Sequence, residues 1–245
     1  VMYQPQVDAR SGRITAVEAL VRWRPPGGGM VPPMEFIPFA EECGLIDAIG
    51  TRVLQHACRD AAAWMARGLD LRVAVNLSSM QFRASGLLDI VRDALATSGL
   101  PAERLELEIT ESALMADDDA TLATLDALRT LGIDIALDDF GTGYSSLSYL
   151  KRLPLGKLKI DRSFVSGLPD DADNLAIVRA ILALARHLGF CITAEGVETP
   201  AQARLLGELE ADSLQGYLFS RPVPAAEIEA LALRTWSPEG AAGLR

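Results

Sequence analysis

Cysteine and histidine are both scarce in this sequence. Its three cysteines, Cys43, Cys58 and Cys191, are widely spaced and include no CxxC pair. This spacing argues against a disulfide framework or a zinc knuckle and predicts reduced thiols. The two histidines, His56 and His187, fall in helical stretches, where we expect structural or surface roles. A histidine general base is therefore not expected.

Positive charge and long apolar runs are scarce as well. Lysine and arginine number 23 against 33 aspartates and glutamates, which gives a formal net charge of −10. This balance argues against a protein that wraps a nucleic-acid polymer, and it means that an anionic ligand would need cations beside it. No uninterrupted apolar run reaches the roughly 20 residues of a membrane span, so no membrane contact is expected for this domain. No signal peptide precedes Tyr3-Gln4-Pro5, which predicts a cytoplasmic location, although a longer parent protein could be membrane-anchored.

The length and the apolar content favour one large core. The chain has 245 residues, 49% of them hydrophobic, close to the roughly 250 residues of a (β/α)8 barrel. Two smaller domains are the alternative. Because the chain starts almost inside a strand and without Met, we expect a domain of a longer protein. Residues 1–235 are predicted to form this domain, and the Gly- and Ala-rich residues 236–245 a tail or linker.

Strand-like and helical patterns alternate along the chain. The eight predicted strands are Met2–Val7, Ile14–Trp23, Leu71–Leu77, Leu105–Thr110, Ile133–Phe140, Lys157–Ile160, Phe190–Ala194 and Ser213–Phe219. Four predicted helices each end just before a glycine, namely Cys58–Arg67, Leu87–Ser98, Ala120–Leu131 and Leu175–Leu188. Glycine adopts the left-handed conformation cheaply and so stops a helix. The repeated order of helix, glycine and strand predicts a mostly parallel sheet. A closed barrel suits eight strands best, and an open doubly wound sheet is the alternative.

Charged side chains occupy alternate positions on several predicted strands. Glu106 and Glu108 alternate with apolar residues, and Lys157 and Lys159 share one face of the sixth strand. In a barrel this face is the interior. Strand ends carry further carboxylates and an amide, so that the set at these ends is Glu18, Asn76, Glu108, Asp138 and Glu195. A solvated polar face, as in an antiparallel sheet, is the alternative, but parallel sheets are usually covered on both faces.

The carboxylates at the strand ends predict a metal site. In a (β/α)8 barrel they would converge at the C-terminal mouth, where this fold carries its chemistry. Neighbouring carboxylates repel one another, and an unpaired buried charge costs several kcal/mol. Oxygen ligands without His or Cys favour Mg²⁺ or Mn²⁺ over Zn²⁺. Proton abstraction then falls to metal-bound water or to Lys159.

A series of motifs resembles one known family. Glu18-Ala19-Leu20 is followed by Val21-Arg22-Trp23. Further blocks then come in order: Phe36-Ile37-Pro38 with Ala40-Glu41-Glu42, Asn76-Leu77-Ser78, Glu108-Ile109-Thr110-Glu111, Asp138-Asp139-Phe140-Gly141-Thr142-Gly143-Tyr144-Ser145-Ser146, Lys159-Ile160-Asp161-Arg162-Ser163-Phe164, Ala194-Glu195-Gly196-Val197-Glu198 and Gln215-Gly216-Tyr217-Leu218-Phe219. Together they resemble the EAL domain of cyclic di-GMP phosphodiesterases from Tyr3 to Pro222.

The resemblance implies a fold and a reaction. Such domains are TIM-like (β/α)8 barrels in which the first strand is antiparallel to the others. They cleave one phosphodiester of cyclic di-GMP to linear pGpG with Mg²⁺ or Mn²⁺, and two ions are expected here. Ca²⁺, which prefers more ligands at longer distances, is expected to inhibit. A non-catalytic cyclic di-GMP receptor, another barrel phosphohydrolase and a structural or interaction domain are the alternatives.

The resemblance also implies roles for individual residues. The implied metal ligands are Glu18, Asn76, Glu108, Asp138, Asp139 and Glu195. Lys159 would contact the attacking water or the phosphate, Gln215 would help to place that water, and both join Glu18 as catalytic residues. The implied substrate contacts are Gln4, Leu20, Arg22, Asp161, Glu198 and Gln215. Glu111 would tether the loop 139–146, which in such domains links the active site to a dimer interface. A homodimer and an upstream regulatory or sensor domain are implied as well.

Overall fold

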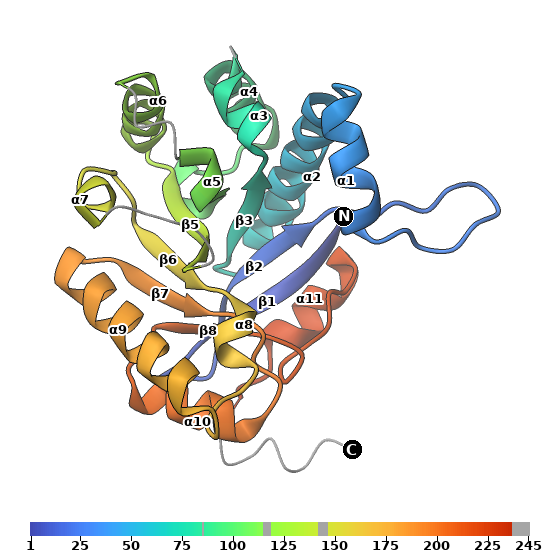
Figure 1. Ribbon diagram of the computed structural model, residues 1–245. Coiled ribbons are helices and arrows are strands. Elements are labelled where there is room, and N and C mark those ends of the chain that lie inside the picture. Colours follow the sequence, from blue (N-terminus) through green and yellow to red (C-terminus); the bar gives the residue numbers. More distant parts are fainter. Residues whose placement is uncertain (85, 115–118, 142–146, 237–245) are drawn as a thin grey trace.

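The strands form one closed barrel in sequence order (Figure 1). The structure is a computed structural model, and it describes residues 1–84, 86–114, 119–141 and 147–236. The strands are β1 (Met2–Asp8), β2 (Ile14–Leu20), β3 (Arg72–Leu77), β4 (Leu105–Thr110), β5 (Asp134–Phe140), β6 (Lys157–Ile160), β7 (Cys191–Ala194) and β8 (Ser213–Gln215). β1 is antiparallel to its neighbours β2 and β8, and the other neighbouring strands are parallel. The predicted TIM-like barrel with an antiparallel first strand is confirmed.

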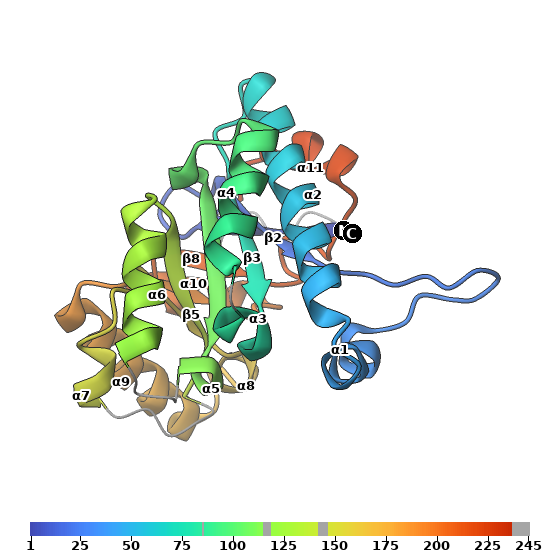
Figure 2. The same cartoon turned by 90° about the horizontal axis from the view of Figure 1, so that it is seen from above.

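Helices cover the outside of this barrel (Figures 1 and 2). The longer ones are α1 (Pro33–Glu42), α2 (Ile46–Ala66), α4 (Leu87–Ser98), α6 (Asp119–Thr130), α9 (Ala172–Leu188), α10 (Pro200–Glu208) and α11 (Ala225–Ala232). Short helices are α3 (Ser79–Arg83), η1 (Ala102–Arg104), α5 (Glu111–Leu114), α7 (Leu147–Leu150) and α8 (Arg162–Val165). Within the described ranges, no helix combines the length and the apolar character needed to cross a membrane.

The glycine stops mark the ends of the predicted helices well. Gly68, Gly99, Gly132 and Gly189, which follow the four predicted helices, all have positive φ values. α4 has the predicted bounds, and α6 and α9 differ from the prediction by at most three residues. The prediction was wrong for the start of α2, which begins at Ile46 rather than Cys58. α1, α10 and α11 were not predicted, although Thr199 caps α10 through a capping box and Pro200 opens it.

Two strands end earlier than predicted. β2 stops at Leu20 because the chain leaves the barrel as a projecting arm, in which Trp23 pairs with Val31 (Figures 1 and 2). β8 stops at Gln215 because Gly216 lies directly against the loop after β7. A Cβ atom added to Gly216 would lie 2.0 Å from the carbonyl oxygen of Val197. Only glycine fits this approach, so the chain turns there, at the rim of the barrel mouth.

The barrel interior is charged and closed to solvent. Glu106 and Glu108 of β4 are each 1% exposed, which excludes the solvated polar face. Deeper in the barrel, the Lys157 ammonium lies 2.6 Å from a Glu106 carboxylate oxygen and 3.4 Å from the amide oxygen of Gln6. Buried charges persist only when they are paired. The strands therefore place ion pairs inside the barrel and their apolar side chains against the helices.

No cysteine or histidine lies at the C-terminal end of a described strand. Cys43 and Cys191 are exposed, Cys58 is buried, and all three thiols are free. His56 and His187 are exposed on α2 and α9.

Near the C-terminus, Trp236 contacts the rest of the domain. Its backbone amide donates to the Gly12 carbonyl oxygen at 2.7 Å, and its indole ring packs edge-on against Phe219. The predicted boundary between residues 235 and 236 stays a prediction, since residues 237–245 lie outside the described part.

Candidate active site

Polar side chains from neighbouring strands meet at the barrel mouth. The strand register pairs Gln4 with Glu18 and Asn76 with Glu108, so each pair lies at one level. Asp138 follows on β5, where it is level with Thr110. The C-terminal ends of parallel strands lie at one rim of a barrel, which is why residues far apart in sequence become neighbours here.

Lys159 lies at the centre of this group. Its side chain is 1% exposed, and its ammonium nitrogen lies 2.7 Å from Glu195 Oε1, 2.8 Å from Glu108 Oε2 and 3.1 Å from Asp138 Oδ1. Glu18 Oε2 is 3.9 Å away. One buried ammonium thus balances carboxylates contributed by four different strands or strand ends. We call Glu18, Glu108, Asp138, Asp139, Glu195 and Lys159 the mouth cluster.

Amide side chains orient one carboxylate of the mouth cluster. The Asn76 amide donates to Glu18 Oε1 at 2.6 Å, and the Gln215 amide donates to Glu18 Oε2 at 2.5 Å. Gln215 also donates to the Gln4 side-chain oxygen at 3.3 Å. Within the described part of the chain, the Gln215 side-chain oxygen has no hydrogen-bond partner. Glu18 is therefore fixed on both oxygens, and Gln215 keeps an unused acceptor at the mouth.

Burial and mutual repulsion shift the proton affinities of the cluster. Burial and the nearby Glu18 raise the pKa of Glu108 well above its usual value. Burial raises the pKa of Glu195 to about 8, with repulsion from Asp138 and Glu18 added and attraction to Lys159 opposed to it. Burial alone would raise the pKa of Glu18 as well, but the Lys159 ammonium and the two amides outweigh burial and lower that pKa. For Lys159, burial is outweighed by Asp138 and Glu108, so its pKa is raised well above the usual value.

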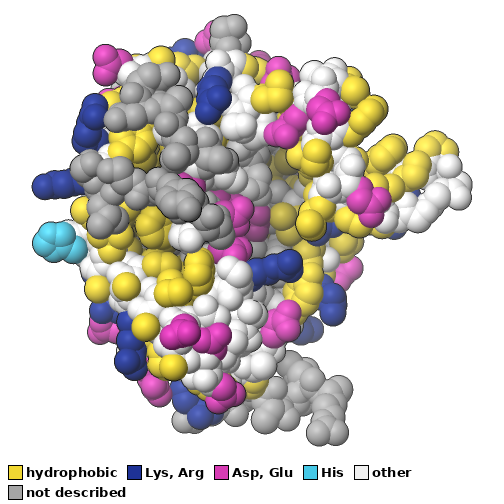
Figure 3. Space-filling view, in the orientation of Figure 1, with side chains coloured by type: hydrophobic (Ala, Val, Ile, Leu, Met, Phe, Trp, Pro, Cys, Tyr) yellow, Lys and Arg dark blue, Asp and Glu magenta, His cyan; other side chains and the backbone are white. Residues whose placement is uncertain are grey.

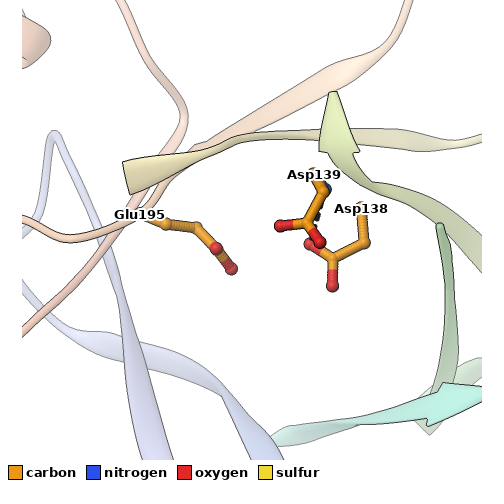
Figure 4. Close-up of side chains that lie close together, drawn as sticks. All are labelled: Asp138, Asp139 and Glu195. Atoms are coloured by element: carbon orange, nitrogen blue, oxygen red, sulfur yellow. Dashed lines mark hydrogen bonds between the residues drawn. The ribbon is translucent and has the colours of Figure 1, made fainter. Parts of the chain in front are cut away.

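Three carboxylates of the cluster face one small space (Figure 4). One oxygen each of Asp138, Asp139 and Glu195 lies within 4.8 Å of the others. Asp139 has a φ of +54°, an uncommon value for a residue other than glycine. Its backbone amide donates to Asp138 Oδ1 at 3.0 Å. Burial, followed by repulsion from Asp138 and Asp161, raises the pKa of Asp139. This left-handed turn keeps two consecutive carboxylates at the same rim.

A cavity of about 190 Å³ opens beside the cluster, and Gln4, Glu18, Asp138, Glu195 and Gln215 contribute to its lining. Acidic side chains gather at the centre of this face in the space-filling view, with basic ones beside them (Figure 3). Glu198, Arg162 and Tyr217 complete the wall, together with the backbone at Gly196 and Gly216. The cavity therefore joins an acidic floor to a rim of mixed charge.

The structure does not bring every predicted substrate contact into this cavity. Leu20 lines a second, more apolar cavity of about 440 Å³, which Asn76 also borders. Arg22 lines neither cavity, and its guanidinium donates to the Val21 carbonyl oxygen at 2.8 Å. The Asp161 carboxylate caps α8 by accepting from the Ser163 backbone amide at 3.0 Å. Arg22 and Asp161 are thus engaged with their own neighbours.

The predicted tether of Glu111 concerns a loop that is mostly outside the described residues. Glu111 opens α5, is 5% exposed, and both its carboxylate oxygens lack a hydrogen-bond partner in the part of the chain that is described. Residues 142–146 of the predicted loop are not described. The tether stays a prediction.

Family membership follows from a comparison with known domains. Residues 1–222 match the family model described as the EAL domain. The chain belongs to the EAL domain family. The glutamate of the Glu18-Ala19-Leu20 triplet is the one that Asn76 and Gln215 hold at the barrel mouth.

Relatives of this EAL domain are longer signalling proteins. It is 51% identical over 227 residues to the bifunctional diguanylate cyclase/cyclic di-GMP phosphodiesterase MucR of Pseudomonas aeruginosa, covering 92% of this chain and 33% of MucR. It is 47% identical over 244 residues to the cyclic di-GMP phosphodiesterase NbdA of the same organism, covering 99% and 31%. A solved structure of the PaMucR phosphodiesterase in complex with c-di-GMP matches with a TM-score of 0.89 and 51% identity, covering 93% and 92% of the two chains. The EAL domain thus spans about a third of the length of these curated relatives.

The donor set of the EAL domain suits divalent cations. The mouth cluster holds five carboxylates and one ammonium, so four negative charges remain if all are ionised (5 − 1 = 4). Glu108 Oε1 is buried and, within the described ranges, has no hydrogen-bond partner. Uncompensated buried carboxylates are costly, and a bound cation would offset that cost. Oxygen ligands without His or Cys match a hard cation.

Sequence reasoning missed two side chains of the EAL domain's cavity wall. Arg162 directly follows the predicted contact Asp161, and Tyr217 belongs to the Gln215-Gly216-Tyr217 block. Both were visible as motif members, but neither was assigned a role. Their place in the cavity depends on the turn at α8 and on the turn after β8, and strand periodicity describes neither turn.

Proposed function

We propose that this EAL domain hydrolyses cyclic di-GMP to linear 5′-pGpG with two divalent cations, Mg²⁺ or Mn²⁺. The observation that carries the proposal is the mouth cluster, in which four carboxylates surround one buried ammonium and a fifth, Asp139, lies beside them at the edge of a cavity. The names of the relatives and the c-di-GMP complex of the similar structure support the substrate. Cyclic di-GMP is an anion, and it would enter this acidic mouth only with cations present.

The proposed ion ligands are oxygen atoms at the barrel mouth, from Glu18, Asn76, Glu108, Asp138, Asp139 and Glu195. When bound, such ions lower the pKa of a coordinated water toward neutrality and offset charge on the phosphate. Asn76 and Gln215 hold the Glu18 carboxylate in one orientation, so a ligand oxygen is positioned before any ion arrives. Such positioning avoids reorganisation during the reaction.

Lys159 and Gln215 would act on the reacting groups. The Lys159 ammonium is fixed by carboxylates on several sides, and we propose that it stabilises the charge that develops on the phosphate. The unused side-chain oxygen of Gln215 would accept a hydrogen bond from the attacking water. Gln4 and Glu198 would contact the nucleotide in the 190 Å³ cavity, and Leu20 in the neighbouring one.

Two further proposed substrate contacts are engaged with their own neighbours in this structure. Arg22 would have to release the Val21 carbonyl oxygen before it could bind a phosphate. Asp161 would contact substrate from the position in which it caps α8.

We also propose that the domain belongs to a longer regulated protein and forms a homodimer, with residues 1–235 as the folded unit. The greater length of the curated relatives supports further domains.

An end-point assay tests the proposed reaction. We expect the purified domain with Mn²⁺ to convert cyclic di-GMP to a product that co-elutes with 5′-pGpG, and we expect EDTA to stop the conversion. Cyclic di-GMP that binds but is recovered intact would instead make the domain a receptor. Cleavage of unrelated diesters with no preference for cyclic di-GMP would indicate another phosphohydrolase.

Calcium should occupy the site without supporting turnover. Ca²⁺ takes 6–8 oxygen ligands at 2.3–2.6 Å, whereas Mg²⁺ requires octahedral geometry at about 2.0–2.1 Å. We therefore expect Ca²⁺ as sole cation to give little product, and Ca²⁺ added to the Mg²⁺ enzyme to inhibit. Initial rates over a Ca²⁺ titration measure this. Undiminished hydrolysis with Ca²⁺ alone would contradict the proposed ion geometry.

A further inference from the structure

Arg162 stands apart from the acidic wall of the 190 Å³ cavity. Among the described residues that line this cavity, it is the only lysine or arginine. It opens α8, is exposed, and its guanidinium forms neither a hydrogen bond nor an ion pair within the described part of the chain. A guanidinium carries five N–H donors and no acceptor. These donors are available to a ligand in the cavity.

The base of the Arg162 side chain is held in place by the loop after β7. Gly196 has a φ of +68°, and a Cβ atom added there would lie 2.4 Å from Arg162 Cβ and 3.1 Å from its Cα. On the other side, the Asp161 carboxylate caps the turn that Arg162 begins. The backbone at Arg162 is therefore fixed against the cavity rim, while its guanidinium has no partner among the described residues.

The same cavity holds a carboxylate that does not neutralise this arginine. Glu198 also lines it, yet no ion pair joins Arg162 and Glu198 among the described residues. Tyr217, which is 50% exposed, contributes an aromatic ring to the same wall. The wall thus offers separate donors and acceptors. Beside them lies the Tyr217 ring, one face of which is covered by the Arg221 guanidinium at 4.2 Å from the ring centre.

Guanine complements this wall better than a phosphate does. Guanine presents two acceptors, O6 and N7, to which an arginine side chain can donate two hydrogen bonds. The N2 amino group of guanine can donate a hydrogen bond to a carboxylate. A second phosphate would instead bring negative charge next to Glu198 and Asp138. Adenine has an amino group, which is a donor, in place of O6. This amino group would face the N–H donors of Arg162, and no hydrogen bond would form there.

We propose that Arg162 is a specificity-determining residue that donates to O6 and N7 of one guanine of the bound dinucleotide, opposite Glu198. This inference rests on the proposed function, because it assumes that cyclic di-GMP is the substrate. It assigns Arg162 to base recognition and leaves the bond-breaking step to the mouth cluster.

The test compares guanine with adenine ligands in one variant. In Arg162→Gln we expect the KM for cyclic di-GMP to rise by roughly 10- to 100-fold, with kcat unchanged. The inhibition constant of cyclic di-AMP, measured as a competitor of cyclic di-GMP hydrolysis, should stay the same or fall, because glutamine pairs with adenine. Arg179→Gln, which removes an exposed arginine from α9, is the matched control and should leave both constants unchanged.

Other results for Arg162→Gln would contradict the proposed recognition of guanine. An equal loss of affinity for both dinucleotides would assign Arg162 to a phosphate and overturn base recognition. An unchanged KM would show that Arg162 makes no contact with the substrate. Because Arg162 is exposed and pairs with no described residue, the variant should melt at the wild-type temperature. A folded variant without the KM change counts against the proposal. A wild-type domain that does not cut cyclic di-GMP would instead refute the proposed function.

Discussion

Asp138→Ala is expected to lower cyclic di-GMP hydrolysis by about a thousandfold or more, through loss of an ion ligand worth several kcal/mol. Asp138 lies where β5 reaches the mouth, and its carboxylate faces Asp139, Glu195 and the Lys159 ammonium. Its removal also relieves repulsion among the carboxylates. Without metal the variant should therefore be no less stable than the wild type. Turnover rates with Mn²⁺ and melting temperatures in EDTA measure the two effects separately.

Asp134→Ala is the matched control, because Asp134 begins the same strand at the opposite end of the barrel. Its carboxylate forms surface ion pairs with Arg72 and Arg129, and losing them should cost about 1 kcal/mol or less. Turnover should stay at the wild-type level. The same design applies to Glu18→Ala, which removes the carboxylate that both amides orient. Wild-type-like hydrolysis by either Asp138→Ala or Glu18→Ala would refute the assignment of these ligands.

Lys159→Met should strongly destabilise the domain in the absence of metal. It removes the one ammonium that four carboxylates contact within 4.0 Å, and breaking a buried ion pair typically costs about 3–5 kcal/mol. Divalent cations should restore much of this loss, since they supply the missing positive charge. Turnover should still fall about 100- to 1,000-fold, because charge developing on the phosphate loses its donor. Denaturant unfolding with EDTA and with Mn²⁺ measures the rescue.

Lys157→Met tests whether that rescue is specific to the mouth. Lys157 lies two residues earlier on β6 and pairs with Glu106 deeper in the barrel. The substitution leaves Glu106 buried without its partner and should destabilise the domain by a similar amount. Mn²⁺ should not restore this loss beyond its effect on the wild type. Equal rescue of both variants would show that the stabilising ions bind somewhere other than the mouth cluster.

Periodicity predicted the interior of the barrel because strands alternate their side chains strictly. Glu106 and Glu108 were expected to point inward, and both are buried opposite Lys157 and Lys159. The glycine stops were also predictable, because a positive φ is a local requirement. The closed parallel arrangement then brought the strand-end side chains together, as the mouth cluster requires. Local sequence rules and barrel geometry therefore agree over the central part of the site.

The periphery of the site could not be predicted in the same way. Arg22 alternates with Glu18 in sequence, but the chain leaves the sheet after Leu20 and the arginine binds its own neighbour's carbonyl oxygen. Arg162 reaches the cavity through a short helix and the close approach of Gly196. The positions of Arg22 and Arg162 depend on tertiary contacts of loops, and the spacing of residues in the sequence does not predict such contacts. The roles of the predicted site residues accordingly remain predictions.

Anomalous diffraction from crystals grown with Mn²⁺ and cyclic di-GMP would locate the ions and the dinucleotide, intact or cleaved. We expect Mn²⁺ peaks inside the barrel mouth, in contact with oxygen atoms of Glu18, Asn76, Glu108, Asp138 and Glu195. We also expect a phosphate of the dinucleotide beside the metal. A mouth that stays free of Mn²⁺ while the nucleotide is bound, or Mn²⁺ held only at other carboxylates, would contradict the proposed ion site.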